Sequence, residues 1–547
     1  MQMARRDRIA AAGASLLALL VACSGEKKKD GETGGGPVAA AAEPDDPAPA
    51  PDTSILPLGV SDPADFNYVW GKGARAYRPV AAALKKQDWR AVRSAAEETL
   101  ELDPGHLDAH RVLASALAQH GEYEEALEHL KIALAGDWTR WGGSVESDPD
   151  LEPLLSSPLG AALREMNARY REELIRRARA GLLVVARRSR FKPVAAGQKR
   201  ARLSSRAEAF VYDRELDRYL RLTQTGFQVV AALPSPSGDE VAYVTVSRVT
   251  TGAPGAAPPV LAELRVGAVS LADPAARAAE AKLTGARTLA LEYLAGDELV
   301  ATVIAPGATV WGEGAASSFT IDKATGKTRP ARPTAPGGRR LLVRYEGVEI
   351  DGAGDAEGIA ADWTPEGGTA EEFVLAASNK RVRLPRGEAA RRASVAWSPD
   401  RRRLALATAA DPCAEAPADR QAALYLVDVE SGKLEHVTRA RSWFMPRFLD
   451  ANLLVFEDDE GRVRFHDAAA GRDSGSLAPR GGIGLHGLGA EQGAICTRDG
   501  AAAQPVPAGA VPAGTAPREQ PAGEAGSESA GGGEENGAGE VEIMTGD

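Results

Sequence analysis

The chain has 547 residues, of which 44% are hydrophobic and 26% are charged, and its formal net charge is −11 at pH 7. This length suits two or three domains, and the apolar fraction is high enough to bury a sizeable core. Residues 501–547 hold eight acidic residues and one arginine, which accounts for −7 of the charge. The remainder is nearly balanced, so the composition favours neither a nucleic-acid partner nor an acidic substrate.

Residues 1–23 have the layout of a secretory signal. Three arginines precede an apolar run, residues 9–21, and small residues lead to Cys23. The run is too short to cross a hydrocarbon core of about 30 Å. Residues 20–23, with the sequence LVAC, resemble the lipobox of bacterial lipoproteins. This resemblance implies that Cys23 is acylated after cleavage, and Ser24 behind it favours an outer-membrane anchor with the protein facing the periplasm.

Residues 24–59 are rich in Lys, Gly, Ala and Pro and contain little from which to build a core. We expect this segment to be a disordered tether that lets the folded part stand away from the membrane. Residues 501–547 have a similar bias toward Pro, Ala, Gly and Glu. The sequence therefore also predicts a disordered acidic tail.

Two further cysteines, Cys413 and Cys496, lie far apart in the sequence. An oxidising periplasm permits a disulfide between them. A disulfide requires the two Cα atoms to lie within about 7 Å, which sequence cannot show. A bridge and two separate thiols both remain open.

Residues 60–180 contain an internal repeat. Residues 87–92 align with residues 121–126 at an offset of 34, and apolar or small residues continue to match downstream. This period and these residue types resemble the tetratricopeptide (TPR) family, in which each repeat is an antiparallel helical hairpin. The resemblance assigns as signature positions Trp89, Pro104, Ala114, Gly121, Tyr123, Ala126 and Ala133.

Two repeats seldom bury enough surface on their own, so we expect a third unit or a cap. Ser157-Pro158 is a helix-start signal. Apolar residues then recur every three or four positions from Leu159 to Leu174. This spacing predicts an amphipathic helix that docks on the last repeat. Upstream, Pro79 interrupts the expected first helix of the earlier repeat.

From residue 181 to about 500, short β-branched runs alternate with Gly, Pro and Asp turns, which indicates antiparallel sheet. A turn in which an Asp is followed by a Gly or a similar residue recurs along this region. Its Asp is residue Asp213, Asp322, Asp428 or Asp467, and a reduced copy surrounds Asn379. In such a turn the Asp accepts backbone N–H groups, and Gly takes the left-handed conformation.

Ser-Pro turns that run into a strand, at residues 235–244 and 398–407, complement the Asp turns. Together these features resemble TolB-like (PD40, WD40-like) β-propellers. The mean spacing of the turns implies about six blades, with seven as the alternative. A β-sandwich with irregular loops is the competing interpretation.

No motif identifies an active site, a cofactor site or a metal site. His106 and His110 stand four residues apart, but no third ligand at metal-site spacing follows. His436 and His466 fall in predicted strands or turns and suggest structural roles. The acidic, Gly-rich loop 351–357 does not have EF-hand spacing, so we expect it to be a solvated loop. Neither a Gly-x-Ser-x-Gly elbow nor a phosphate-binding loop occurs in the sequence.

The segment 164–206 carries fourteen basic and three acidic residues. A solvated helix face in an arginine-rich protein explains this bias most simply. The alternative is a contact with an anionic glycan, lipopolysaccharide phosphate or an acidic protein, since charge attraction speeds such encounters.

The sequence thus predicts a multi-domain protein with N-terminal all-α TPR hairpins and a C-terminal all-β propeller. Both resemblances imply interaction scaffolds, so we expect a lipid-anchored, non-catalytic adaptor that binds envelope proteins through the TPR groove or the propeller face. Fold alone does not fix function. One alternative is a glycan- or peptidoglycan-binding protein. Another is a propeller-type lyase or hydrolase, which would need His, Arg and carboxylates converging on one face.

Overall fold

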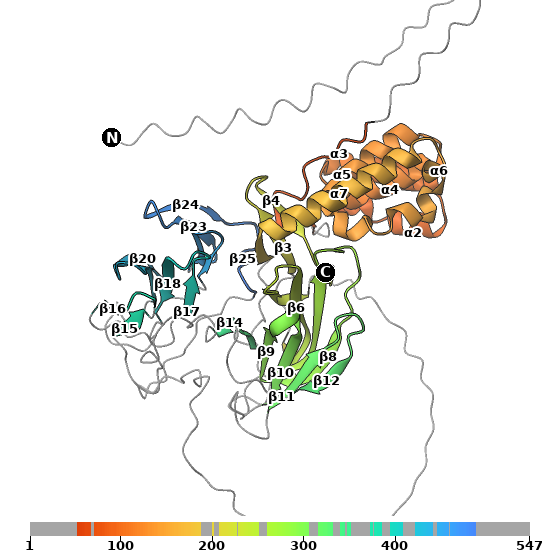
Figure 1. Cartoon of the computed structure of the whole chain (residues 1–547). Helices are drawn as coiled ribbons and strands as arrows, with labels where there is room; N and C mark the ends of the chain where they lie inside the picture. The colour runs from red at the N-terminus through yellow and green to blue at the C-terminus, as the bar shows by residue number, and fades with distance from the viewer. Residues whose placement is uncertain are drawn as a thin grey trace, which may run out of the picture. The chain divides into compact units, whose positions relative to one another are not determined.

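The structure is a computed structural model of the chain (Figure 1). It describes residues 52–66, 71–186, 200–201, 207–226, 228–250, 260–305, 316–331, 340–344, 347–351, 372–375, 377–385, 394–408, 422–440, 446–458 and 460–487.

Helices fill the first part of the described chain, up to residue 180. They are η1 (Pro63–Phe66), α1 (Ala74–Tyr77), α2 (Val80–Lys85), α3 (Trp89–Leu102), α4 (Leu107–Gln119), α5 (Tyr123–Trp141), η3 (Val145–Ser147), η4 (Pro149–Leu151), α6 (Glu152–Leu155) and α7 (Gly160–Ala180). Among the described helices, none combines the length and the hydropathy that a membrane span requires.

Helices α3, α4 and α5 follow one another as antiparallel hairpins. Asp88 caps α3 by accepting a hydrogen bond from the Ala91 amide at 3.1 Å. The turn between α4 and α5 contains Gly121, whose φ of +81° is the left-handed conformation that glycine adopts without strain. Helices α3 and α5 begin at Trp89 and Tyr123, 34 residues apart.

Helix α7 buries the face that its sequence periodicity predicts. Leu163, Met166, Tyr170 and Leu174 are all buried in the largest hydrophobic cluster of the helical part. The Tyr170 hydroxyl donates a hydrogen bond to the Lys131 carbonyl at 3.1 Å, which ties α7 to α5.

Strands occupy the described chain from residue 182 onward. They are β1 (Leu182–Ala186), β2 (Arg200–Ala201), β3 (Glu208–Asp213), β4 (Arg218–Arg221), β5 (Val229–Pro234), β6 (Glu240–Thr250), β7 (Val260–Ser270), β8 (Ala281–Ala286), β9 (Thr288–Tyr293), β10 (Leu299–Ile304), β11 (Ala316–Ile321), β12 (Thr328–Ala331), β13 (Arg340–Arg344), β14 (Gly347–Asp351), β15 (Glu372–Leu375), β16 (Lys380–Arg383), β17 (Ser394–Trp397), β18 (Arg403–Ala407), β19 (Ala422–Asp428), β20 (Leu434–Ala440), β21 (Arg447–Phe448), β22 (Leu453–Glu457), β23 (Val463–Asp467), β24 (Arg472–Leu477) and β25 (Ile483–Gly484). A short η5 (Ala295–Asp297) lies between β9 and β10.

The described strands form six sheets, and their pairing is antiparallel within each sheet. Two are simple four-stranded meanders, β17-β18-β19-β20 and β21-β22-β23-β24. A further four-stranded sheet has the order β25-β1-β3-β4, so the last described strand pairs with the first. Successive meanders with this pairing between the two ends of the strand region fit a propeller-like arrangement better than two packed sheets.

The predicted division into N-terminal helices and C-terminal antiparallel strands is confirmed. Three of the six described sheets depart from a regular four-stranded repeat: one has two strands, one has five, and one is extended to six strands because β13 pairs with β9. A buried ion pair between Arg340 on β13 and Glu292 on β9, with Nε and Oε2 2.9 Å apart, accompanies this pairing. Such an addition leaves no signal in the local turn pattern.

Residues 52–59 differ from the tether assigned to residues 24–59. They belong to an ordered segment, residues 52–66, which we call the strap. Leu58 is buried, and the Gly59 amide donates to the Ala135 carbonyl at 2.7 Å. Val60 pairs with Tyr219, so the strap covers the free edge of β4. Apolar Ile55 and Leu58 give this end of the tether side chains to bury, whereas Leu56 is 41% exposed.

Candidate functional site

The described residues bring buried charged groups together where the helices meet the first sheet. Helix α5 carries the first of them at a break in its backbone. Asp137 has φ −146° and ψ 67°, values that are not helical. Gly136 just before it packs so closely that a Cβ there would lie 2.4 Å from Leu107 Cδ2. The break turns the Asp137 carboxylate toward β4.

Arg221, at the end of β4, reaches this carboxylate. Its Nη1 lies 3.1 Å from Asp137 Oδ2, and its Nη2 lies 3.2 Å from Glu208 Oε1. All three side chains are buried, and Glu208 is 0% exposed. Burial raises the pKa of Asp137, while the neighbouring guanidinium of Arg221 acts in the opposite direction. A buried cluster of this kind needs every partner, because removing one leaves an uncompensated charge.

Hydroxyl groups complete the cluster. The Thr223 hydroxyl donates to Glu208 Oε2 at 2.5 Å, and the Thr225 amide donates to Oε1 of the same carboxylate at 2.8 Å. Thr139 donates to Asp137 Oδ1 at 3.0 Å. The carboxylates therefore have hydrogen bonds besides their ion pairs, as burial of charge requires.

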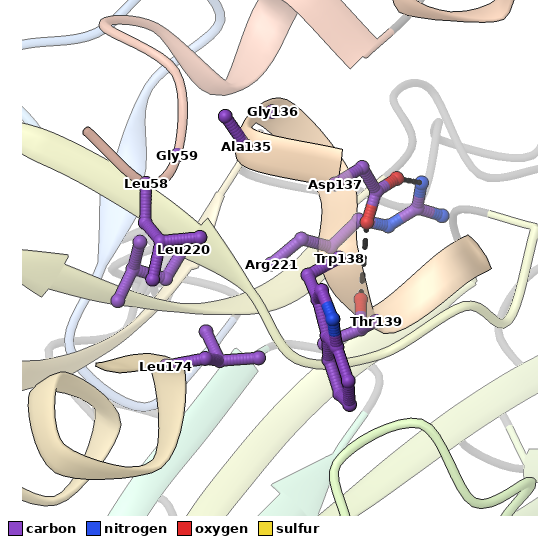
Figure 2. A pocket seen from close by; sticks show the side chains of 10 residues that line it. All are labelled: Leu58, Gly59, Ala135, Gly136, Asp137, Trp138, Thr139, Leu174, Leu220 and Arg221. Carbon is purple, nitrogen blue, oxygen red and sulfur yellow. Dashed lines mark hydrogen bonds and ion pairs between the residues drawn. The ribbon is translucent and has the colours of Figure 1, made fainter. Parts of the chain in front are cut away.

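A small pocket borders the cluster (Figure 2). Its lining comes from the strap, from the break in α5, from α7 and from β4, with Leu58, Asp137, Trp138, Leu174 and Arg221 among the residues. The pocket has room for about one water molecule. Small-molecule sites usually measure roughly 300–1,000 Å³. We therefore interpret this region as a joint between the helices and the sheet.

The strap closes the joint from the other side. Lys131 on α5 is buried, and its Nζ lies 2.8 Å from Asp52 Oδ2. The Leu56 amide donates to the Tyr170 hydroxyl at 3.0 Å. At the far end, Arg480 pairs with Asp62 and Asp65. Three parts of the chain that are distant in sequence are thus joined by residues 52–66.

The repeated Asp residues make the turns that the sequence predicts. Asp213 Oδ1 accepts from the Glu215 amide at 2.8 Å, and Asp467 Oδ1 accepts from the Ala469 amide at 2.9 Å. Asp322 and Asp428 make the same kind of turn. The residue at the glycine position has positive φ in each copy. This residue is Asp217 in the first copy and Asn379 in the reduced copy.

The TPR signature positions lie in the helical hairpins. Trp89 and Tyr123 open α3 and α5, and Pro104 lies between α3 and α4. Ala114, Ala126 and Ala133 are each 0% exposed, in keeping with close helix crossings at small residues. Gly121 forms the turn between α4 and α5.

Helix α4 carries polar side chains, among them Asp108, Arg111 and Gln119. These side chains have partners on α5 or on the chain that follows it. Arg111 pairs with Asp148, and the Gln119 amide nitrogen donates to the Asp150 carbonyl at 3.1 Å. Asp108 pairs with Arg140, with Oδ1 and Nη1 2.5 Å apart.

Three histidines gather between the hairpins. His106 caps α4, its Nδ1 accepting from the Ala109 amide at 3.1 Å. Nδ1 of His110 lies 2.8 Å from Nδ1 of His129, so His110 contacts His129 rather than using this nitrogen for His106, the other member of the pair singled out by spacing. Burial lowers the pKa of His106 and of His129 to about 4 and also lowers that of His110.

The two strand histidines have local partners. His436 stacks edge-on against Tyr425, with ring centroids 5.5 Å apart. His466 Nδ1 lies 3.1 Å from Asp473 Oδ1. Within the described part of the chain, no three His, Cys, Asp or Glu side chains are grouped so that they could hold a metal ion.

The arginines of α7 make contacts within the molecule. Arg169 pairs with Glu165, and Arg177 pairs with Asp213 across to the sheet at 2.6 Å. Arg179 pairs with Asp239 at 2.7 Å. The part of segment 164–206 that lies on α7 therefore contributes to the joint.

Several sequence-based predictions concern residues outside the described ranges. These are Cys23 and its lipidation, the pair Cys413 and Cys496, most of the loop 351–357 and the tail 501–547. The joint was missed by sequence reasoning. Asp137 and Arg221 are 84 residues apart, and no local periodicity connects them. The only signal was a Gly-Asp pair inside an otherwise helical pattern.

Neither family models nor curated proteins match this chain. Among solved structures it is similar to TolB from Acinetobacter baumannii, with 11% identity, a TM-score of 0.30, and coverage of 56% of this chain and 66% of the other. It is also similar to a putative TolB from Agrobacterium tumefaciens, with 15% identity, a TM-score of 0.28 and coverage of 52% and 92%.

An oligogalacturonate lyase in complex with manganese is a third similar structure. It shares 12% identity at a TM-score of 0.23, with coverage of 53% of this chain and 77% of the lyase. TM-scores this low do not define a common fold, so the description of the sheets rests on their own strand pairing.

Proposed function

We propose that the protein is a lipid-anchored periplasmic scaffold that binds protein partners at the outer membrane, without catalysis. Cys23 would carry the lipid. The TPR-like hairpins and the propeller-like sheets would supply the binding surfaces.

The observation that carries this proposal is the strap. Residues 52–66 follow the proposed tether directly, and they are bonded to α5, to α7 and to β4. If the protein is anchored through its N-terminal segment, the strap would therefore keep the surface of the helices and the surface of the sheets in a fixed relation. A scaffold needs this arrangement, because two surfaces in a fixed relation bind two partners in a fixed relation.

The joint supports the same interpretation. The cluster of Asp137, Arg221 and Glu208 is buried, and it connects α5 to β3 and β4 without exposing a charged group to a ligand. Such groups orient neighbouring elements when all their hydrogen bonds are made.

The anchor is tested by comparing the wild type with Cys23→Ser in cells given labelled palmitate. We expect label and membrane fractionation for the wild type, and an unlabelled soluble protein for the variant. Two acyl chains or more are needed for stable anchoring, so loss of the acylated cysteine should release the chain. An unlabelled wild type would overturn the lipoprotein assignment.

Partner binding is tested with a photo-crosslinking residue placed at exposed positions, Glu98 on α3 and Lys327 beyond β11. We expect a defined protein to be captured in the anchored chain from at least one position, and the same protein to be lost with Cys23→Ser. If the two positions yield only background in the anchored protein, the scaffold proposal fails.

A further inference from the structure

The first helical hairpin carries an uncompensated basic surface, which we call the basic face. Residues 72–90 contain one acidic residue and six basic ones. The basic residues are Lys72, Arg75, Arg78, Lys85, Lys86 and Arg90. All six are exposed. Among the described residues, none of the six side chains takes part in a hydrogen bond or ion pair.

The backbone places three of these residues on a common side. Arg78 and Pro79, between α1 and α2, both keep helical φ and ψ, so the helical spacing runs through the break. Arg75, Arg78 and Lys85 then follow one helical stripe at intervals of three and seven. The opposite side, with Ala76 and Val80, is buried.

Three of the neighbouring acidic groups are already engaged, and a fourth, Asp103, lies beside Gly73. Asp88 caps α3. Glu97 and Glu122 both pair with Arg93, which lies just past the basic face. The arginines of α7 differ in that Arg169, Arg176 and Arg177 each have carboxylate partners. The basic face is thus a concentrated positive surface that attracts a counter-charge.

The chain itself contains a segment of the opposite sign. Residues 501–547 hold eight acidic residues and one arginine. Sixty residues follow Gly487, the last that the structure describes, and they can span up to about 200 Å when extended. A compact unit of about 440 residues has a radius of gyration of about 22 Å. The acidic segment can therefore reach any surface of the described unit.

We propose that the acidic segment 501–547 docks on the basic face of its own chain and shields this face from external anions. Each exposed ion pair is weak. Several pairs on a tethered segment act together, because the tether replaces a bimolecular encounter by a local one. Salt screens exposed charges over about 8–10 Å, so the docked state should open as ionic strength rises. This inference goes beyond the proposed scaffold function and does not depend on it.

The test is zero-length carbodiimide crosslinking of the full chain at low salt, which joins a carboxylate to a lysine amine in direct contact. We expect carboxylates of 501–547 to be joined to Lys72, Lys85 or Lys86 several-fold more often than to the exposed lysines of the sheets. These reference lysines are Lys282, Lys327 and Lys433. A mixture of isotope-labelled and unlabelled chains should give products within one chain.

Matched variants separate docking from mere proximity. The triple variant Arg75→Gln, Arg78→Gln, Arg90→Gln keeps the reactive lysines, and its yield of these crosslinks should fall several-fold. The triple variant Arg164→Gln, Arg169→Gln, Arg176→Gln removes the same charge from α7 and should leave the yield unchanged. Circular dichroism verifies that both variants are folded.

A second measurement does not depend on the carboxylates. Deleting residues 501–547 should raise the rate at which an amine-reactive ester labels Lys72, Lys85 and Lys86 several-fold, while Lys282 labels as before. Equal crosslinking to all exposed lysines would overturn the proposal. So would products that join two chains, or equal yields from the two arginine variants.

Discussion

Asp137 and Arg221 form a buried ion pair between a broken helix and an edge strand, with Oδ2 and Nη1 3.1 Å apart. Arg221 also contacts Glu208, so one guanidinium serves two carboxylates. The stability of the helical part and of the first sheet should therefore depend on the same residue.

Replacing Arg221 by Met should destabilise the protein by about 3–5 kcal/mol, because two buried carboxylates lose their common partner. Differential scanning calorimetry measures the change. Arg169→Met is the matched control, since Arg169 forms an exposed pair with Glu165, and such pairs contribute little. Equal melting temperatures for the two variants would show that the joint is not a stabilising element.

The strap makes a second, steric prediction. Gly59 has φ +82°, and a Cβ there would lie 2.5 Å from the Tyr219 carbonyl oxygen. Gly59→Ala should therefore lower the melting temperature, with about 1–2 kcal/mol from the left-handed backbone alone. Gly105→Ala meets nothing within 4 Å and should be neutral or slightly stabilising. If Gly59→Ala melts like the wild type, the strap is not held against β4 in solution.

The histidines predict a loss of stability in acid. Burial lowers the pKa of His106 and His129 to about 4, whereas histidines of an unfolded chain titrate near 6.5. The folded state thus binds fewer protons between these values, and its stability falls as pH decreases from about 7 to 4. Asp108 and Asp137, whose pKa burial raises, act in the opposite direction.

A variant isolates the contribution of His129. In His129→Asn the amide can still donate to His110 Nδ1, but it does not titrate. Thermal melts between pH 7 and pH 4.5 should show a shallower decline for this variant than for the wild type. His120→Asn, on the exposed end of α4, should follow the wild type. Parallel declines for all three proteins would contradict the assignment.

The Ser-Pro turn before β18 gives a prediction for the sheets. Ser398 is buried, and its Oγ accepts from the Arg403 amide at 2.9 Å. Ser398→Ala should cost about 0.5–1.5 kcal/mol, because the partly buried Arg403 amide loses that partner. Ser94→Ala on the exposed side of α3 should change the free energy of unfolding by less than about 0.5 kcal/mol. Urea denaturation followed by far-UV circular dichroism compares the two.

Local rules explain which features the sequence could predict. The burial of Leu163 and Tyr170 follows from helical spacing. The positive φ of Asn379 follows from turn chemistry. The joint could not be predicted in this way, because it depends on contacts between Asp137, Glu208 and Arg221, which no periodicity relates. The addition of β13 to β9 is similarly non-local.

The boundary of the tether shows a different limit. Composition separates segments that can bury apolar surface from those that cannot, but it averages over a window. Residues 52–59 contain Pro and Asp beside Leu58, and their order arises from partners far along the chain, such as Ala135 and Tyr219. The predictions made from the sequence did not include the basic face, although residues 72–90 hold six basic residues and one acidic residue. Only the structure distinguishes the basic face from α7, whose arginines are paired.

The pairing of β25 with β1 sets the order in which the molecule can be completed. Val185 faces Gly484, so the first sheet gains its fourth strand only after nearly 300 further residues have been synthesised. Until then β1 presents an unpaired edge beside helices that can already form. Contacts over such separations slow folding, and open edges invite association with other chains. A nascent chain would therefore depend on being kept apart from its neighbours until β25 emerges.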